Sequence, residues 1–485
     1  MDKGKMAKDT FLFLPAKIIE GVIVMLTTAL YTKLFITEAY GSFQIINTTM
    51  LVAYLICASW LTNSATRYIG DELKKDSGRA FYSTIISSYL AISAAVCAIC
   101  LVLYLAGSNS SWPAGALMFA AYTLFMMLNA MLVQAGLIKW SIILSLTDVS
   151  VKLAAAYFFA GMLPSGAGTP YPAVFASASG DFIASVGALF ALNIPYLYKP
   201  SRFSKSLFSG LMRFGFPLIG VSVSVGLLNM VDRYIVVLSM GKAPFAVYSA
   251  NYAISSGVFT MLMVGVMRGV YPAVLSAWRD GGREKAVPYL DAGVRLYALI
   301  ALPSAAGLVA VGSLLSRILF ARPEYHAGAP VIGITACAMF FMGLTEYANK
   351  AYELTKNTVP VLQNAAFSAV IKVASSFLLL PLFGISGAAF GTFLAFLFYF
   401  VLTALRAKKL FIFHMSARRK LNIFISSALC ALAAYSASML PVHPAVALIL
   451  AVFAGFFVYA SSIVLSGEVK NELDFIMKRL KIKKI

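Results

Sequence analysis

Residues 445–465 read AVALILAVFAGFFVYASSIVL, an apolar run without a charged side chain. A run of this length crosses the hydrocarbon core of a bilayer as an α-helix, which takes about 20 predominantly apolar residues. Comparable runs recur along all 485 residues of the chain. The sequence therefore predicts an all-α polytopic membrane protein.

The composition excludes the other classes of protein that a chain of this size can form. Hydrophobic residues make up 60% of it and charged residues 12%, whereas soluble domains average about 45–50% and about 25%. With 36 Phe and 24 Tyr the chain is too aromatic for an intrinsically disordered protein. A membrane β-barrel alternates apolar and polar residues at every second position, but the apolar runs here are continuous.

About 14 transmembrane helices are predicted when each must contain about 20 apolar residues. An even number of spans places both termini on the same side of the membrane. The expected spans are 11–32, 43–64, 80–106, 113–136, 141–163, 172–196, 211–239, 246–272, 292–315, 330–349, 358–380, 387–405, 421–440 and 445–465.

The basic residues between the spans indicate the orientation. The segments predicted to be cytoplasmic hold 31 Lys and Arg, and the outer loops hold 4. By the positive-inside rule, both termini are expected in the cytoplasm and the protein in the cell inner membrane. The formal net charge of +20 then indicates loops held against anionic membrane lipids, and we expect no nucleic-acid partner.

The first six spans resemble spans seven to twelve. Val151-Lys152-Leu153-Ala154 in span 5 recurs as Ile371-Lys372-Val373-Ala374 in span 11. Two six-helix lobes of the same topology are typical of transporters. We therefore predict an N-terminal lobe at 1–198 and a C-terminal lobe at 199–410, followed at 411–485 by two additional spans and a basic cytoplasmic tail.

Short motifs along the chain resemble those of the Wzx-type polysaccharide flippase family. That family belongs to the multidrug/oligosaccharidyl-lipid/polysaccharide (MOP) superfamily, together with lipid II flippases and multidrug/toxin exporters. The resemblance covers nearly the whole chain and implies two pseudo-symmetric lobes that move a lipid-linked oligosaccharide by alternating access. The motifs are Phe35-Ile-Thr-Glu-Ala-Tyr40-Gly41, Leu211-Met-Arg-Phe-Gly-Phe-Pro217, Leu228-Asn229-Met-Val-Asp232-Arg233, Phe320-Ala-Arg-Pro-Glu324-Tyr325 and Gly384-Ile-Ser-Gly387.

Charged residues inside the predicted spans are candidates for the transport site, because a charge at the bilayer centre costs roughly 2.5–3.5 kcal/mol. Cations suit the polyprenyl-pyrophosphate-linked glycan that the resemblance implies as the substrate. The expected substrate-binding residues are Arg233, Lys152, Lys372, Lys17, Arg67 and Arg268, and the expected coupling residues are Glu20, Asp148, Asp181 and Asp232.

Several of these residues have a purely structural alternative. Lys17 and Glu20 lie one turn apart, as do Asp148 and Lys152, so each pair can neutralise itself on one helix. Arg67 and Arg268 lie near inner helix ends, where long side chains reach toward water. Lys372, in contrast, has no acidic residue within a turn, and we expect it to lack an ion-pair partner. Because basic residues predominate among the charges deep in the predicted spans, we expect a cationic cavity between the two lobes.

Signatures of catalysis and of metal binding are missing. The chain contains no Gly-x-x-x-x-Gly-Lys-Ser/Thr loop for a nucleotide phosphate. His326, His414 and His443 are scattered over separate loops and do not have the spacing of a metal site. We therefore expect neither enzymatic activity nor a cofactor nor a bound metal.

The sequence favours a flippase for a polyprenyl-pyrophosphate-linked oligosaccharide or a related polysaccharide precursor. A polysaccharide polymerase and glycosyltransferases are its expected protein partners. Three alternatives stay open: a drug or toxin exporter of the same superfamily, a lipid II-type flippase for a peptidoglycan precursor, and a membrane scaffold of a polysaccharide-assembly complex that transports nothing.

Overall fold

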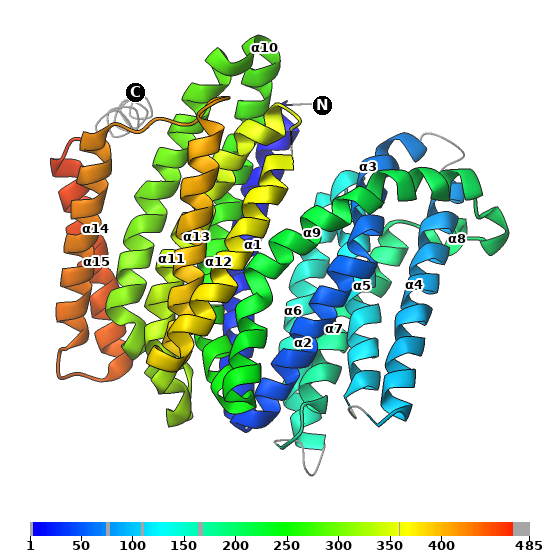
Figure 1. Cartoon of the computed structure of the whole chain (residues 1–485), viewed down its shortest axis with the longest axis horizontal. Coiled ribbons are helices and arrows are strands. Elements are labelled where there is room, and N and C mark those ends of the chain that lie inside the picture. Colours follow the sequence, from blue (N-terminus) through cyan, green and yellow to red (C-terminus); the bar gives the residue numbers. More distant parts are fainter. Residues whose placement is uncertain (1–2, 74–77, 108–110, 163–167, 358, 469–485) are drawn as a thin grey trace, which may run out of the picture. The chain divides into compact units, whose positions relative to one another are not determined.

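The computed structural model describes residues 3–73, 78–107, 111–162, 168–357 and 359–468. These residues form helices and connecting loops and contain no β-strand (Figure 1), so the all-α prediction is confirmed. The predicted basic tail after residue 468 lies outside the described residues. The helices are α1 (Lys3–Leu34), α2 (Thr37–Cys57), α3 (Ser59–Glu72), α4 (Arg79–Leu105), α5 (Trp112–Gln134), α6 (Ile138–Met162), α7 (Tyr171–Ala191), α8 (Ile194–Leu197), α9 (Lys205–Met240), α10 (Lys242–Leu319), α11 (Ala329–Leu354), α12 (Val359–Phe383), α13 (Ile385–Ala407), α14 (Ala417–Ser438) and α15 (Pro444–Leu465).

The predicted spans correspond to these long helices. Twelve of the described helices are long and apolar enough to cross a membrane. One of them, α10, holds two predicted spans, because Gly281 and Gly282 break its helical geometry between them. Gly282 has φ 61°, a left-handed conformation that glycine adopts without a steric penalty. Together with α1, which contains the predicted span 11–32, the helices account for the predicted fourteen.

The second predicted span, 43–64, is divided in the structure. Helix α2 ends at Cys57 and α3 begins at Ser59, with Ala58 outside helical geometry between them. Side chains replace the backbone partners lost at the break, since the Trp60 indole donates to the Cys57 carbonyl at 2.9 Å and the Ser59 hydroxyl donates to the Leu55 carbonyl at 2.6 Å. In a bilayer such replacement is required, because water does not satisfy freed carbonyls.

The chain divides into two compact units. The first unit comprises Met1–Ala250 and Val361–Phe377, and the second comprises Asn251–Pro360 and Leu378–Ile485. Most of α12 therefore belongs to the first unit, although its chain neighbours α11 and α13 belong to the second. The lobe boundaries expected at 198 and 410 stay a prediction.

In the first unit, α5 is the most buried of the long apolar helices, and it contacts α2, α3, α4, α6 and α7. Helix α9 packs on α3 through Gly215. A Cβ atom there would lie 3.0 Å from the carbonyl carbon of Trp60 and nearer still to its oxygen. The close approach lets the Ser64 hydroxyl on α3 donate to the Leu211 carbonyl on α9 at 2.8 Å.

In the second unit, α11 packs on α13 and α14 packs on α15. The α14–α15 pair is tied to the second half of α10 by polar contacts. The Tyr459 hydroxyl donates to the Leu299 carbonyl at 2.6 Å, and the Arg295 guanidinium pairs with the Glu468 carboxylate at 2.9 Å. These contacts hold the two additional helices against the rest of their unit.

Gly215→Ala should destabilise the protein. The added methyl group meets backbone atoms of Trp60 that cannot rotate away, and overpacking of this kind typically costs about 1–3 kcal/mol. Gly220→Ala in the same helix is the matched control, because a Cβ there meets nothing within 4 Å. Thermal unfolding of the purified protein in detergent should show a lower midpoint for the first variant only. Equal midpoints for the two variants would contradict close packing at Gly215.

Candidate functional site

The first unit contains a cavity of about 450 Å³ lined by α1, α2, α5, α6 and α7. Five aromatic side chains line it: Tyr31, Tyr40, Phe43, Tyr122 and Phe125. Tyr31 stands edge-on to Phe43, with ring centroids 5.3 Å apart, so the rings support one another. The faces of aromatic rings are suited to contact with the apolar side of a sugar ring or with an organic cation.

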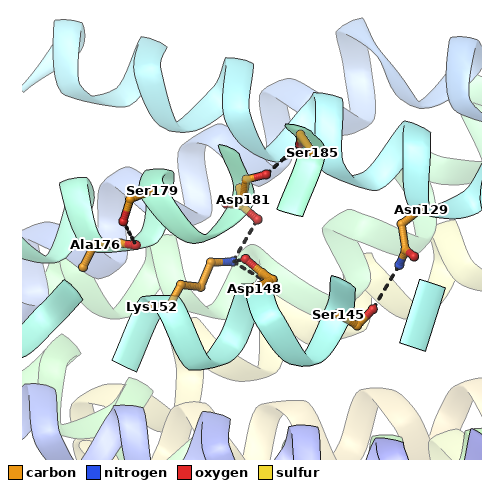
Figure 2. A network of polar contacts seen from close by, with 8 residues as sticks. All are labelled: Asn129, Ser145, Asp148, Lys152, Ala176, Ser179, Asp181 and Ser185. Atoms are coloured by element: carbon orange, nitrogen blue, oxygen red, sulfur yellow. Dashed lines mark hydrogen bonds and ion pairs between the residues drawn. The ribbon is translucent and has the colours of Figure 1, made fainter. Parts of the chain in front are cut away.

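Lys152 and two carboxylates form a charged cluster in the lining of this cavity (Figure 2). The ammonium lies 2.8 Å from the Asp181 carboxylate on α7 and 3.0 Å from the Asp148 carboxylate on its own helix, α6. The side chain of Lys152 is 21% exposed, whereas those of Asp148 and Asp181 are 7% and 3% exposed. Lys152 is therefore the most accessible side chain of the cluster.

Local sequence explains how the cluster forms. Asp148 and Lys152 are four residues apart, which places them on one face of α6. Asp181 comes within reach because Gly180 allows α7 to approach α6 closely. A Cβ atom at Gly180 would lie 2.6 Å from the Asp148 carbonyl oxygen, so a larger residue would force the two helices apart.

The charge of this cavity differs from the expectation. Sequence analysis predicted a cavity whose charges lean basic, but the lining of this one includes the three carboxylates of Glu20, Asp148 and Asp181 and the single ammonium of Lys152. The expected cationic cavity lies between the two lobes and stays a prediction, whereas this cavity within the first unit is acidic. A count of charges along the sequence does not show which of them share a cavity.

Asp232 and Lys372 form a second ion pair in the first unit, between α9 and α12. Their charged atoms are 2.9 Å apart and neither side chain is exposed. Lys372 also donates to the Leu228 carbonyl at 2.9 Å, and the Tyr248 hydroxyl donates to the Asp232 carboxylate. The expectation that Lys372 lacks an ion-pair partner is therefore wrong, because its partner comes from another helix.

The other expected cations lie elsewhere. Arg233 is half-buried and its guanidinium faces the Thr48 hydroxyl of α2 at 3.5 Å. Arg67 is exposed and lines a separate cavity of the first unit. The side chains of Lys17 and Arg268 lie outside the described residues. Sequence reasoning had not assigned Tyr248 to the site. Its only signal was its place in the stretch Val247-Tyr248-Ser249-Ala-Asn-Tyr252, which also resembles the flippases.

Metal ligands are not gathered in the described part of the chain, which holds no group of three or more His, Cys, Asp or Glu placed to bind a metal ion. The five cysteines are all free thiols. The chemistry available at the described cavity is thus ion pairing, hydrogen bonding and contact with aromatic faces.

Variants of the buried pair should reveal its structural role. Lys372→Met leaves the Asp232 carboxylate buried without its ammonium, and breaking a buried pair in this way typically costs about 3–5 kcal/mol. The double variant Lys372→Met with Asp232→Asn should recover much of that loss, because no uncompensated charge is left. The midpoints of thermal unfolding are measured for both single variants and for the double variant, which gives a complete double-mutant cycle. Additive losses would mean that the two side chains are not coupled.

Solved structures of membrane transporters resemble this fold. The lipid II flippase MurJ in an inward closed conformation has a TM-score of 0.75 at 15% identity, and the match covers 96% of this chain and 100% of that one. An inward-facing multidrug resistance MATE transporter of the MOP superfamily has a TM-score of 0.60 at 11% identity, covering 84% and 98%. A MOP superfamily transporter from Pyrococcus furiosus, with a binding pocket described as of reverse polarity, has a TM-score of 0.59 at 11% identity, again covering 84% and 98%.

None of the curated protein sequences matches the chain. The structural likenesses confirm the predicted fold, and the twelve described helices that are long and apolar enough to cross a membrane support a multi-pass membrane protein. A sequence profile of a family described as polysaccharide biosynthesis protein matches residues 6–278, more than half of the chain. The chain therefore belongs to the polysaccharide biosynthesis protein family.

Proposed function

We propose that this protein is a flippase that moves a polyprenyl-pyrophosphate-linked oligosaccharide, or a related polysaccharide precursor, across the cell inner membrane by alternating access. Both termini lie in the cytoplasm in this proposal. A polymerase and glycosyltransferases supply or consume the glycan on the two sides. Membership of the polysaccharide biosynthesis family and the flippase-like fold support it.

The observation that carries the proposal is an apolar cavity in the second unit. It measures about 750 Å³ and is lined by α10, α11, α13 and the start of α14, with aromatic side chains such as Phe340, Phe341 and Phe400. Lys420 is the charged residue of its lining. A lipid-linked sugar needs a polar site and an apolar one, and this cavity suits the first isoprenoid units next to the pyrophosphate.

The head group would bind through cations of the candidate site. Lys152 is the strongest candidate, because it lines a cavity with aromatic walls and two carboxylates hold it in place. Arriving phosphates would compete with Asp148 and Asp181 for the ammonium, and the released carboxylates would take up a coupling cation. Further proposed phosphate ligands are Arg233, Lys17, Arg67 and Arg268, and a further proposed coupling residue is Glu20. For Lys372 and Asp232, expected as a phosphate ligand and a coupling residue, we propose a structural role instead, because they pair with each other and neither side chain is exposed.

A second candidate function has one specific observation in its favour. The cavity of the first unit combines three carboxylates with aromatic rings, and this is the chemistry that binds an organic cation. A drug or toxin exporter with this fold would use it directly. The apolar cavity beside α14 favours the lipid-linked substrate, and transport of a fluorescent organic cation by the same proteoliposomes would favour the exporter.

The transport assay separates these functions. In proteoliposomes, the wild type should flip a fluorescent polyprenyl-pyrophosphate-linked oligosaccharide, and Lys152→Gln should slow this roughly ten- to hundredfold, the equivalent of one charge-assisted hydrogen bond. Lys152→Arg keeps the charge and should retain most of the activity.

Arg317→Gln is the control, because Arg317 is an exposed arginine in the second unit, outside both cavities. All variants are compared at equal amounts of folded protein. If the wild type exports an organic cation and does not flip the lipid-linked sugar, the proposal is wrong. Unchanged flipping in Lys152→Gln, Arg67→Gln and Arg233→Gln would refute the assigned head-group site. A scaffold without transport predicts no flipping by the wild type.

A further inference from the structure

A second cavity of the first unit, here called the amide pocket, lies between α3, α5 and α9. It measures about 550 Å³, within the range of about 300–1,000 Å³ that small-molecule sites occupy. Polar side chains line it from each of the three helices: Asn63 and Arg67 from α3, Gln134 from the end of α5, and Ser222 from α9. It shares no lining residue with the cavity around Lys152.

These four side chains share one property. None of them forms a hydrogen bond or an ion pair with another residue in the part of the chain that the structure describes. In contrast, the Asn129 carboxamide of the first unit contacts the hydroxyls of Ser141 and Ser145. Asn63 and Ser222 are half-buried, whereas Arg67 and Gln134 are exposed. Half-buried polar groups without a partner are unfavourable, so the unused hydrogen-bonding groups of Asn63 and Ser222, beside an accessible arginine and carboxamide, indicate a polar ligand.

The chemistry of the lining narrows the class of ligand. Two carboxamides and a hydroxyl offer both donors and acceptors, which is what a ring with many hydroxyl groups requires. Arg67 adds a fork of N–H donors that suits a phosphate. Phe214 lines the same cavity and is held edge-on to Tyr68, with ring centroids 6.0 Å apart, so it offers an aromatic surface to the apolar side of a sugar.

From this lining we infer that the amide pocket binds a sugar phosphate, namely the first sugar of the lipid-linked substrate together with its adjacent phosphate. The inference rests on the proposed function and adds to it a glycan-binding site that is separate from the cavity around Lys152. Asn63 and Gln134 bind sugar hydroxyls, and Arg67 binds the phosphate. The basic residues near this end of α3 place the pocket at the cytoplasmic end of the first unit in the proposed orientation, where the substrate is made.

Binding of soluble sugar phosphates tests the inference without transport. The full chain in lipid nanodiscs is titrated with a panel of hexose and N-acetylhexosamine 1-phosphates, with inorganic phosphate, and with the free sugars, and binding is followed by ligand-observed NMR. At least one sugar phosphate should bind the wild type more tightly than inorganic phosphate or its own free sugar.

The variants should then separate the two halves of the ligand. Asn63→Ala and Gln134→Ala should each weaken binding of the sugar phosphate roughly three- to tenfold, the equivalent of one neutral hydrogen bond, and should leave inorganic phosphate unaffected. Arg67→Gln should weaken both ligands. Asn357→Ala removes an exposed amide of the second unit and should change neither, which makes it the matched control.

Three results would overturn the inference: no sugar phosphate binds the wild type, inorganic phosphate binds as tightly as the best sugar phosphate, or the amide variants bind as the wild type does. The flipping assay distinguishes this failure from failure of the proposed function. Normal flipping by the wild type and by both amide variants rejects the amide pocket and leaves the flippase standing. If the wild type flips nothing, the flippase itself is rejected.

Discussion

A charge within a membrane protein needs a partner, and this constraint arranges the first unit. At two positions an ammonium contacts oxygens of a neighbouring helix. Lys152 contacts Asp181 on α7 as well as Asp148 on its own helix, and Lys372 contacts Asp232 and the Leu228 carbonyl on α9. Each contact forms only if the helices approach closely. The pairs therefore determine which helices are neighbours, and they join α6 to α7 and α9 to α12.

The constraint also explains which parts of the fold the sequence predicts. Apolar runs of bilayer length are local features, so the spans were predictable, and so was the pair of Asp148 and Lys152 four residues apart. The break at Ala58 was not, because the Trp60 indole and the Ser59 hydroxyl that compensate for it are ordinary residues of an apolar run. Only the folded chain shows that they face freed carbonyls.

The same limit applies to the candidate site. Lys372 has no acidic residue on its own helix. Its partner, Asp232, precedes it by 140 residues, so local spacing does not indicate the pair. The acidic character of the cavity around Lys152 was hidden because Asp148 and Asp181 come from different spans. Glycine was the one available signal of such contacts: Gly180 and Gly215 stand where a Cβ would meet the backbone of another helix. A glycine in a predicted span does not, however, name the helix it packs against.

The two lysines differ in how they are held, and this difference supports the two proposed roles, a structural one for Lys372 and a transport role for Lys152. Lys372 is fully buried beside a single carboxylate, so the ion pair neutralises both charges within the contact between the two helices. Lys152 faces two carboxylates, and its side chain is 21% exposed and lines the cavity. A ligand anion can then exchange with one carboxylate without leaving the ammonium unpaired. A group that must bind and release an anion in each cycle needs such a second partner, whereas a group that only joins two helices does not.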